Sequence, residues 1–357
     1  MTTSINGTTG VTFPDLSVQP IAAGSYTMGF KNRIINGAMV IDQRNEGAEV
    51  NPAVNSRYYL DRWEALSTVA SKFKIGQNAG AVTPPAGYSN YLGCTSLSAY
   101  TVGASETFAV RQQIEGLNVA DLAWGTASAA TVTLSFWVRS SLTGTFGGVL
   151  KNSAGNRSYP FTYSISSANT WEQKSVTVAG DTSGTWLATN GVGIIVVLSI
   201  GAGATVSGTA GSWAGANYNS ATGATSVVGT NGATFYITGV QLEKGSTATS
   251  FDVRPYTTEL QLCQRYYSIG NISNGGGVGF KYGVATTLMF NSAHTFPVEM
   301  RISPTLTLGT PTYFNSSAIS AFSDSSPSNE GFLTRVTVAS TSTYRAYGAT
   351  WEADAEL

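Results

Sequence analysis

The chain has 357 residues with a formal net charge of −1, and only 11% of them are charged. An average soluble domain has about 25% charged residues, so Ser, Thr, Asn and Gln side chains must cover most of this surface. Because there is no basic excess to neutralise phosphates, no nucleic-acid partner is expected. Such a surface suits an extracellular or virion protein that contacts sugars through hydroxyl and amide groups.

Residues 1–30 are polar and rich in Gly and Thr, with one short extended piece at 10–18. They hold too few apolar side chains to fold alone. Their first ten residues, MTTSINGTTG, have neither the basic nor the apolar region of a signal peptide. We therefore expect a distinct N-terminal segment and no signal peptide.

The region 31–258 is predicted to consist of short strands separated by Gly, Asn and Ser turns. Apolar and polar residues alternate most clearly at 131–139, as expected for a strand with one buried face. A second alternating run stands at 174–180. Many short strands with turns between them favour a β-sandwich or jelly roll. The apolar face of the first run comprises Val132, Leu134, Phe136 and Val138.

Two segments inside this region allow a different interpretation. Apolar residues at 56–73 recur at helical spacing, but the segment has no convincing helix caps. Residues 191–210 are uncharged, but their continuous apolar part, 194–200, is far shorter than the ~20 residues that span a membrane. We interpret 194–200 as a buried strand and expect no membrane insertion.

The stretch 233–269 indicates where one β domain ends and the next begins. A β-rich run at 234–242 is followed by a polar turn and by an extended piece at 251–256, in which Pro255 disfavours a helical conformation for Arg254. An aromatic segment, QRYY, then leads into a tail of different composition.

The tail, 259–357, is long enough for a compact β domain of about 100 residues. Strands are predicted at 280–290 and around 298–303. Pro297 and Pro304 bracket the second of these, which limits it to an edge strand or a crossing between strands.

Four runs stand in the order found in a known family: NRIINGAMVIDQRN (32–45), YYLDRW (58–63), VTLSFWVRS (132–140) and the stretch 233–269. Over residues 31–267 the chain resembles the carbohydrate-binding-module-like jelly roll of bacteriophage tail fibres and tailspike-like adhesins. The resemblance implies an all-β fold and a strand within 56–73. It also implies three parts: an extended N-terminal segment (1–30), a jelly-roll β-sandwich (31–258) and a smaller β-rich C-terminal domain (259–357).

The resemblance also implies a function. A phage tail fibre is a receptor-binding protein that adheres non-covalently to bacterial surface polysaccharide or lipopolysaccharide. It is expected as a homotrimer in the virion tail, made in the host cytoplasm and attached through its N-terminus to other tail or baseplate proteins. Two alternatives remain open: a tailspike-type polysaccharide depolymerase and a purely structural virion appendage.

Reactive groups form no catalytic set in the sequence. His294 is the lone histidine, and no nucleophile motif accompanies it. A glycosidase needs two carboxylates, but acidic residues are few, and Asp61 and Arg62 are expected in salt bridges. We predict no enzyme activity, no cofactor and no metal site, although the resemblance leaves open a structural calcium at Asp252. The acidic residues near one another are Asp42, Glu46, Glu49, Asp61 and Glu64, and the cysteines expected to be reduced and buried are Cys94 and Cys263.

Aromatic residues supply the candidate glycan site, because an aromatic face packs on the apolar side of a sugar ring. Trp63 and Trp137 lie within predicted strands and are expected in the core, whereas Trp171 and Trp186 are left open. The candidates are aromatic residues among small polar neighbours: Trp213, Tyr218, Tyr313, Phe314, Tyr344, Tyr347 and Trp351. For each, the alternative is packing in a loop or at a subunit interface. We expect the receptor surface on the tail, with the first two residues as a second possibility.

Overall fold

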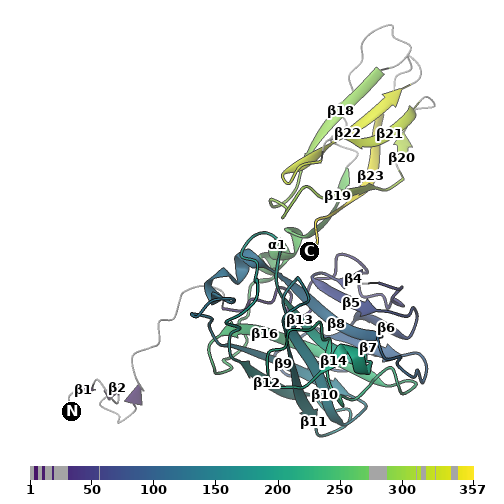
Figure 1. The fold of residues 1–357 in the computed structure, drawn as a ribbon. Helices are drawn as coiled ribbons and strands as arrows, with labels where there is room; N and C mark the ends of the chain where they lie inside the picture. Colours follow the sequence, from purple (N-terminus) through teal and green to yellow (C-terminus); the bar gives the residue numbers. More distant parts are fainter. Residues whose placement is uncertain are drawn as a thin grey trace.

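The computed structural model describes residues 31–55, 57–272, 288–310, 312–314, 319–325, 327–338 and 345–357. Of the first 30 residues it describes only three short antiparallel strands, β1 (Ser4–Asn6), β2 (Gly10–Thr12) and β3 (Val18–Gln19). A large β-sandwich forms most of the molecule, and a second, smaller β unit stands above it (Figure 1).

The sandwich consists of two antiparallel sheets. One sheet contains β4 (Arg57–Leu60), β5 (Trp63–Ser67), β8 (Thr107–Glu115), β10 (Gly144–Lys151), β11 (Ser158–Ile165) and β13 (Val192–Ala202). The other contains β6 (Phe73–Gln77), β7 (Leu92–Ser96), β9 (Val132–Ser140), β12 (Glu172–Val178) and β16 (Thr234–Lys244). Their strand orders are β11-β10-β13-β8-β5-β4 and β12-β9-β16-β7-β6.

The chain crosses repeatedly from one sheet to the other, which is the jelly-roll arrangement. The all-β jelly roll predicted from the sequence is confirmed, and so are the strands within 56–73 and at 194–200. The short connecting elements are η1 (Gly116–Asn118), η2 (Ala120–Leu122), η3 (Ala204–Val206), β14 (Ser207–Gly208) and β15 (Ser220–Ala221). No helix in the described part of the chain is long and apolar enough to cross a membrane.

Alternation along the strands builds the core between the sheets. The predicted face of β9 is fully buried, and it belongs to one apolar cluster with Ile194, Val196 and Leu198 of β13 in the opposite sheet. Trp63 is in this core, as predicted. The prediction that Trp137 lies in the core was wrong. It alternates with the core residues of β9, and because successive side chains of a strand point to opposite faces, it lies on the outer face, where it is half-buried.

The helix α1 (Tyr256–Gln264) was not predicted, and it is the only α-helix in the described residues. Pro255 immediately precedes it, where the missing N–H costs the helix no hydrogen bond. Cys263 and Tyr266 pack against Ile35 and Ile41. The helix therefore closes one end of the sandwich, across the position where the sequence predicts a domain boundary.

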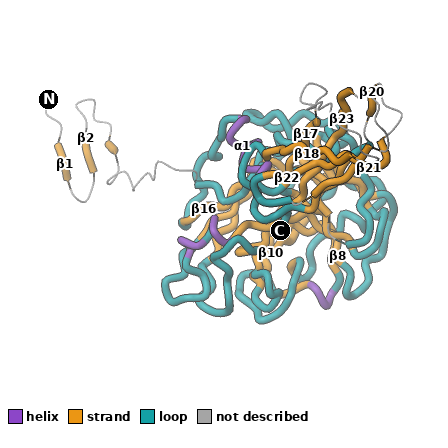
Figure 2. The backbone as a smooth tube through the Cα atoms, turned by 90° about the horizontal axis from the view of Figure 1, so that it is seen from above, coloured by secondary structure: helices purple, strands orange, loops and turns teal. Residues whose placement is uncertain are grey.

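The smaller unit is β-rich, as predicted. One sheet joins β17 (Tyr267–Ile272), β19 (Thr305–Leu308), β20 (Thr312–Phe314) and β23 (Arg345–Asp354), and the other has the order β18-β22-β21, with β18 (Leu288–Thr295), β21 (Ile319–Ser325) and β22 (Gly331–Val338). Seen from above, this unit covers one side of the sandwich (Figure 2). Residues 298–303 form no strand and make the crossing from β18 to β19, the second of the two predicted alternatives.

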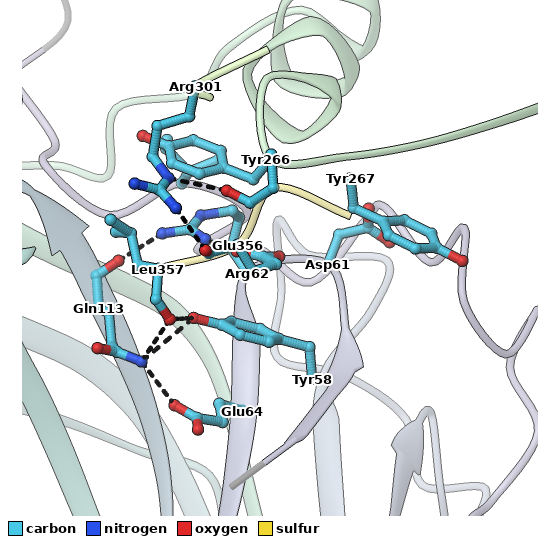
Figure 3. Close-up of polar contacts among 12 residues, drawn as sticks. Tyr58, Asp61, Arg62, Glu64, Gln113, Tyr266, Tyr267, Arg301, Glu356 and Leu357 are labelled. Atoms are coloured by element: carbon cyan, nitrogen blue, oxygen red, sulfur yellow. Dashed lines mark hydrogen bonds and ion pairs between the residues drawn. The ribbon is translucent and has the colours of Figure 1, made fainter. Parts of the chain in front are cut away.

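A buried arginine joins the two units (Figure 3). Asp61 and Arg62 form the two-residue turn between β4 and β5, and Arg62 has a φ of 66°, a conformation that usually selects Gly or Asn. Arg62 is nevertheless only 1% exposed. Its guanidinium carbon lies 3.6 Å from the centroid of the Tyr266 ring, and the group forms an ion pair with Glu356 and donates a hydrogen bond to the carbonyl of Gln113.

Further polar contacts surround this pair. Arg44 lies 2.9 Å from the Glu356 carboxylate and stacks 3.7 Å from the Tyr267 ring centroid. Arg301 donates to the carbonyl oxygens of Ala355 and Glu356 at 2.8 and 2.6 Å. The chain segment after β23 is thus held to the sandwich by charged groups, and Leu357 adds an apolar contact with the cluster of Ile35, Ile41, Cys263 and Tyr266.

We expect Arg62→Met to lower the free energy of unfolding by about 3 kcal/mol, because it removes a buried ion pair and the hydrogen bond to the Gln113 carbonyl and leaves Glu356 with Arg44 as its cationic partner. Urea denaturation followed by tryptophan fluorescence measures this. Lys74→Met is the matched control, since the Lys74–Glu49 pair is about one-third exposed and should contribute less than about 1 kcal/mol. Equal losses in the two variants would contradict the assignment.

Asp61, in the same turn, makes the free energy of unfolding depend on pH. Burial raises its pKa from 3.8 to about 6, although Arg44 and two hydrogen bonds from Gln43 oppose the shift. Between these two pKa values the folded chain holds a proton that the unfolded chain has released. Lowering the pH through 6 therefore stabilises the folded state at this residue.

Comparison of the wild type with Asp61→Asn isolates this effect. From pH 7.5 to pH 4.5, the free energy of unfolding of the wild type should rise by roughly 2 kcal/mol relative to the variant, because the folded wild type takes up its proton over the interval from about pH 6 down to pH 4.5, at about 1.36 kcal/mol per pH unit. Urea titrations at several pH values measure the difference. A difference that stays constant with pH, or that falls as the pH is lowered, would show that Asp61 is ionised throughout.

Candidate functional site

Two of the predicted tail aromatics, Tyr313 and Tyr347, are cross-strand neighbours in the structure. Tyr344 lies outside the described residues, and Tyr313, Phe314 and Tyr347 belong to paired strands, β20 and β23, whose side chains there are also not described. Trp351 was predicted on loop-rich polar ground, and this was wrong. It lies on β23 and is 7% exposed, packed against Phe296 and Phe332, so it fills the core of the smaller unit.

Trp213 has aromatic neighbours that its sequence surroundings do not reveal. Its ring centroid lies 5.4 Å from those of Trp124 and Trp186 and 5.3 Å from that of Tyr159. Its indole N–H donates to the carbonyl of Ala179 at 2.8 Å. Trp213 therefore anchors its loop to the sandwich by packing and a satisfied hydrogen bond.

Tyr218 also has a packing partner. Its ring lies directly over Gly208, where any Cβ would clash with it, and it packs on an apolar patch outside the β10–β13 sheet. The adjacent Asn219 accepts a hydrogen bond of 2.6 Å from the buried Lys151 ammonium. Burial lowers the pKa of Lys151 to about 8. This loop thus covers the outer surface of the β10–β13 sheet.

The other sheet of the sandwich has an outer face with different chemistry. On β9, β12 and β16 most residues that point away from the core carry hydroxyl, amide or aromatic groups, and Arg139 carries a guanidinium. Trp137 lies between Gln173 and Thr238 of the neighbouring strands. We call this surface the outer sheet face. Its residues are Ser135, Trp137, Arg139, Gln173, Ser175, Thr177, Tyr236 and Thr238.

A groove of about 380 Å³ lies on the outer sheet face, a size within the usual range for small-molecule sites. Its charged group, Lys174, is already paired with Glu172 at 2.5 Å. The groove therefore offers mainly uncharged donors and acceptors. It is lined by Ser135, Gln173, Lys174, Ser175, Ala248, Thr249 and Ser250.

Aromatic rings stand beside this groove. Trp171 lies 5.7 Å from Tyr91 and 6.4 Å from Tyr236, measured between ring centroids, and is half-buried. The Nε of Arg139 is buried with no hydrogen-bond partner among the described residues, and its guanidinium carbon lies 5.9 Å from the Tyr236 ring centroid. The sequence missed this site because Trp137 was assigned to the core. The sequence did contain a signal for it, because Trp137 alternates with the apolar residues of β9 and therefore shares a face with its polar residues.

The groups examined for catalysis have structural partners. Asp42 accepts backbone hydrogen bonds from its own turn, Glu64 pairs with Arg111 at 2.6 Å, and Asp252 accepts the backbone N–H groups of Lys31 and Asn32. Within the described ranges no cluster of three His, Cys, Asp or Glu residues could hold a metal ion.

The histidine and the cysteines are also in structural positions. His294 is half-buried, stacks on Phe332 and lies 2.9 Å from the Thr334 hydroxyl, and its burial lowers its pKa. Cys94 and Cys263 are free and buried, as predicted, and burial raises the pKa of both thiols. Buried thiols of this kind are poor nucleophiles.

No protein-family model matches the chain, and no curated protein does. Among solved structures, the enzymatically active domain of tailspike protein 4 of bacteriophage CBA120 is 11% identical with a TM-score of 0.31, over 60% of this chain and 22% of that one. This chain thus spans about a fifth of that tailspike chain.

Two further structures are smaller proteins. A putative sugar-binding protein from Bacteroides thetaiotaomicron is 14% identical with a TM-score of 0.35, over 60% of this chain and 100% of that one. A family 11 carbohydrate-binding module of a Clostridium thermocellum cellulase is 12% identical with a TM-score of 0.26, over 55% and 99%. The assignment of the jelly roll rests on the strand order described above, independently of these likenesses.

Trp213→Ala should lower the free energy of unfolding by about 2 kcal/mol without any ligand, because it removes a half-buried aromatic from a packed cluster. Thermal and urea unfolding measure this. Leu117→Ala is the control, since Leu117 is 56% exposed and its loss should stay within about 0.5 kcal/mol. A Trp213 variant as stable as the wild type would instead indicate a ring kept free for a ligand.

Proposed function

We propose that this chain is a phage receptor-binding tail fibre that adheres non-covalently to bacterial surface glycan, and that the outer sheet face contacts the sugar. The observation that carries the proposal is that the half-buried Trp137 and the exposed Gln173 are cross-strand neighbours beside a weakly charged groove. An indole face can pack on a pyranose ring while amides and hydroxyls bind its edge.

The proposal includes adhesion through several copies of the chain. A shallow groove binds one sugar segment weakly, and a homotrimer would engage several segments of one polysaccharide at once. In this proposal residues 1–30 attach the fibre to other tail or baseplate proteins. Whether the tail carries a second receptor surface stays a prediction, because most of its candidate side chains are not described.

The partners of the acidic residues favour adhesion over a tailspike-type depolymerase. A glycosidase needs two carboxylates facing its substrate, whereas Asp42 and Glu64 are engaged in a turn and an ion pair. A purely structural appendage is the second alternative, and the polar groove on an accessible face is what distinguishes a binding protein from it.

Binding to host cells tests the proposal. We expect the purified chain to bind susceptible cells and block phage adsorption, and Ser175→Tyr, which fills the groove, to reduce cell binding at least tenfold. Ser164→Tyr, at an exposed position on the opposite sheet, is the matched control and should bind like the wild type. Light scattering of the same sample reports whether the chain is trimeric.

Two results would contradict the proposal. Release of reducing ends from host polysaccharide by the wild type would mark a depolymerase. Failure of the folded wild type to bind any susceptible cell, or to block adsorption, would leave only a structural role.

A further inference from the structure

A second and larger hollow lies where the sandwich meets the smaller unit. It has a volume of about 660 Å³, and none of the predicted site residues lines it. We call it the joint cleft. Its lining residues are Arg44, Asn45, Val50, Asn51, Ala53, Arg57, Tyr58, Tyr59, Tyr267, Thr305, Thr307, Glu352 and Asp354.

One wall of the joint cleft is a face of the sheet β17-β23-β19. Tyr267, Asp354 and Thr305 are cross-strand neighbours in one row, and Glu352 and Thr307 are neighbours in the next. Alternation along β23 places Trp351 and Ala353 in the core and leaves the intervening carboxylates on the cleft side. This wall therefore presents hydroxyl and carboxylate groups at regular spacing.

The opposite wall comes from the sandwich, from the segment that precedes β4 and from β4 itself. Tyr58 reaches toward the joint from β4, and Tyr267 lies on the far side of it (Figure 3). Arg57 is exposed and makes no hydrogen bond or ion pair within the described part of the chain. The amide of Asn51 and the hydroxyls of Thr305 and Thr307 likewise have no partner among the described residues.

The charges of the joint cleft balance. Arg44 and Arg57 face Glu352 and Asp354, so the lining residues have a formal sum of zero. Arg44 is already compensated by Glu356 at 2.9 Å and Asp354 at 3.5 Å. Burial raises the pKa of the Tyr267 hydroxyl, and the negative charge of the nearby Glu352 adds to this shift, whereas Arg44 opposes it. A carboxylate or phosphate ligand would find no net positive field here.

We propose that the joint cleft is a second glycan site, one that takes a neutral sugar. The free guanidinium of Arg57 can donate two parallel hydrogen bonds, and a carboxylate such as Glu352 can accept two. Vicinal hydroxyl groups of a neutral pyranose match both arrangements, and the threonine and asparagine groups bind the remaining edge. The inference rests on the proposed function, because it assigns a second binding site and a ligand class to the same adhesion.

A ligand in this position touches both units of the chain. It would stabilise the joint that Arg62 and Glu356 hold together, since a ligand that binds only the folded state adds to its stability. Ligand binding in the joint cleft would then raise the melting temperature of the whole chain. The outer sheet face lies within the sandwich alone.

Saturation-transfer NMR with the full chain tests the inference. The probes are the methyl glycosides of glucose, galactose, mannose and rhamnose, each compared with sodium glucuronate. We expect transfer to at least one neutral glycoside and none to glucuronate. Thr307→Tyr, which narrows the cleft from an exposed position, should remove the part of this transfer that comes from the joint cleft. Ser175→Tyr on the outer sheet face should leave transfer from the joint cleft intact, and the double variant should show no transfer. Arg57→Ala and Glu352→Ala should each raise the Kd about tenfold, equivalent to 1.4 kcal/mol.

The outcomes separate this inference from the proposed function. Loss of transfer in Ser175→Tyr with full transfer in Thr307→Tyr overturns the joint cleft and leaves the outer sheet face as the site. Stronger saturation transfer to glucuronate than to the neutral glycosides would show that the ligand is not a neutral sugar. Absence of transfer to every probe overturns the inference, while the cell-binding assay still decides the proposed function. Melting temperatures confirm that each variant is folded, and Thr305→Tyr replaces Thr307→Tyr if the latter unfolds.

Discussion

The buried charge of Arg62 is the constraint on which the arrangement of the two units depends. A guanidinium that is only 1% exposed requires a carboxylate and further hydrogen-bond acceptors, because an uncompensated charge in the interior is costly. Glu356 and the Gln113 carbonyl supply these groups, and the Tyr266 ring covers the remaining face. Tyr266 lies at the start of the smaller unit and Glu356 at its end. Contacts of both with Arg62 therefore orient that unit on the sandwich.

This constraint also accounts for the local geometry of the β4–β5 turn. A left-handed residue in such a turn is normally Gly or Asn, and hairpin turns are normally exposed to solvent. Here both turn residues are buried, because Tyr266, Tyr267 and Glu356 lie against them. The raised pKa of Asp61 follows from the same burial. The turn therefore serves as the contact surface of the sandwich at the joint.

The chain has few charged residues, and the structure places many of them in ion pairs or at the joint between the two units. Many of the described arginines are engaged in the joint or in ion pairs such as Arg157–Asp181. The outer sheet face consists mostly of amides, hydroxyls and aromatic rings, with the guanidinium of Arg139 among them. A surface of this kind is hydrated without long-range electrostatic attraction, which suits contact with a neutral polysaccharide at any ionic strength.

Many of the strands and the fold class could be predicted from the sequence, because strands leave patterns among neighbouring residues. The face of β9 from Val132 to Val138 showed period-two alternation, the strand at 194–200 was a continuous apolar run, and the closing strand β16 was a β-rich run. The partners of single side chains could not be predicted in this way. Trp213 looked isolated because Trp124, Trp186 and Tyr159 are distant in sequence, and Trp137 was assigned inward although the same alternation turns it outward. These placements could be seen only in the folded chain, and so could the helix α1 and the joint cleft. Each of them depends on contacts between segments that are far apart along the chain, and a local sequence pattern does not encode such contacts.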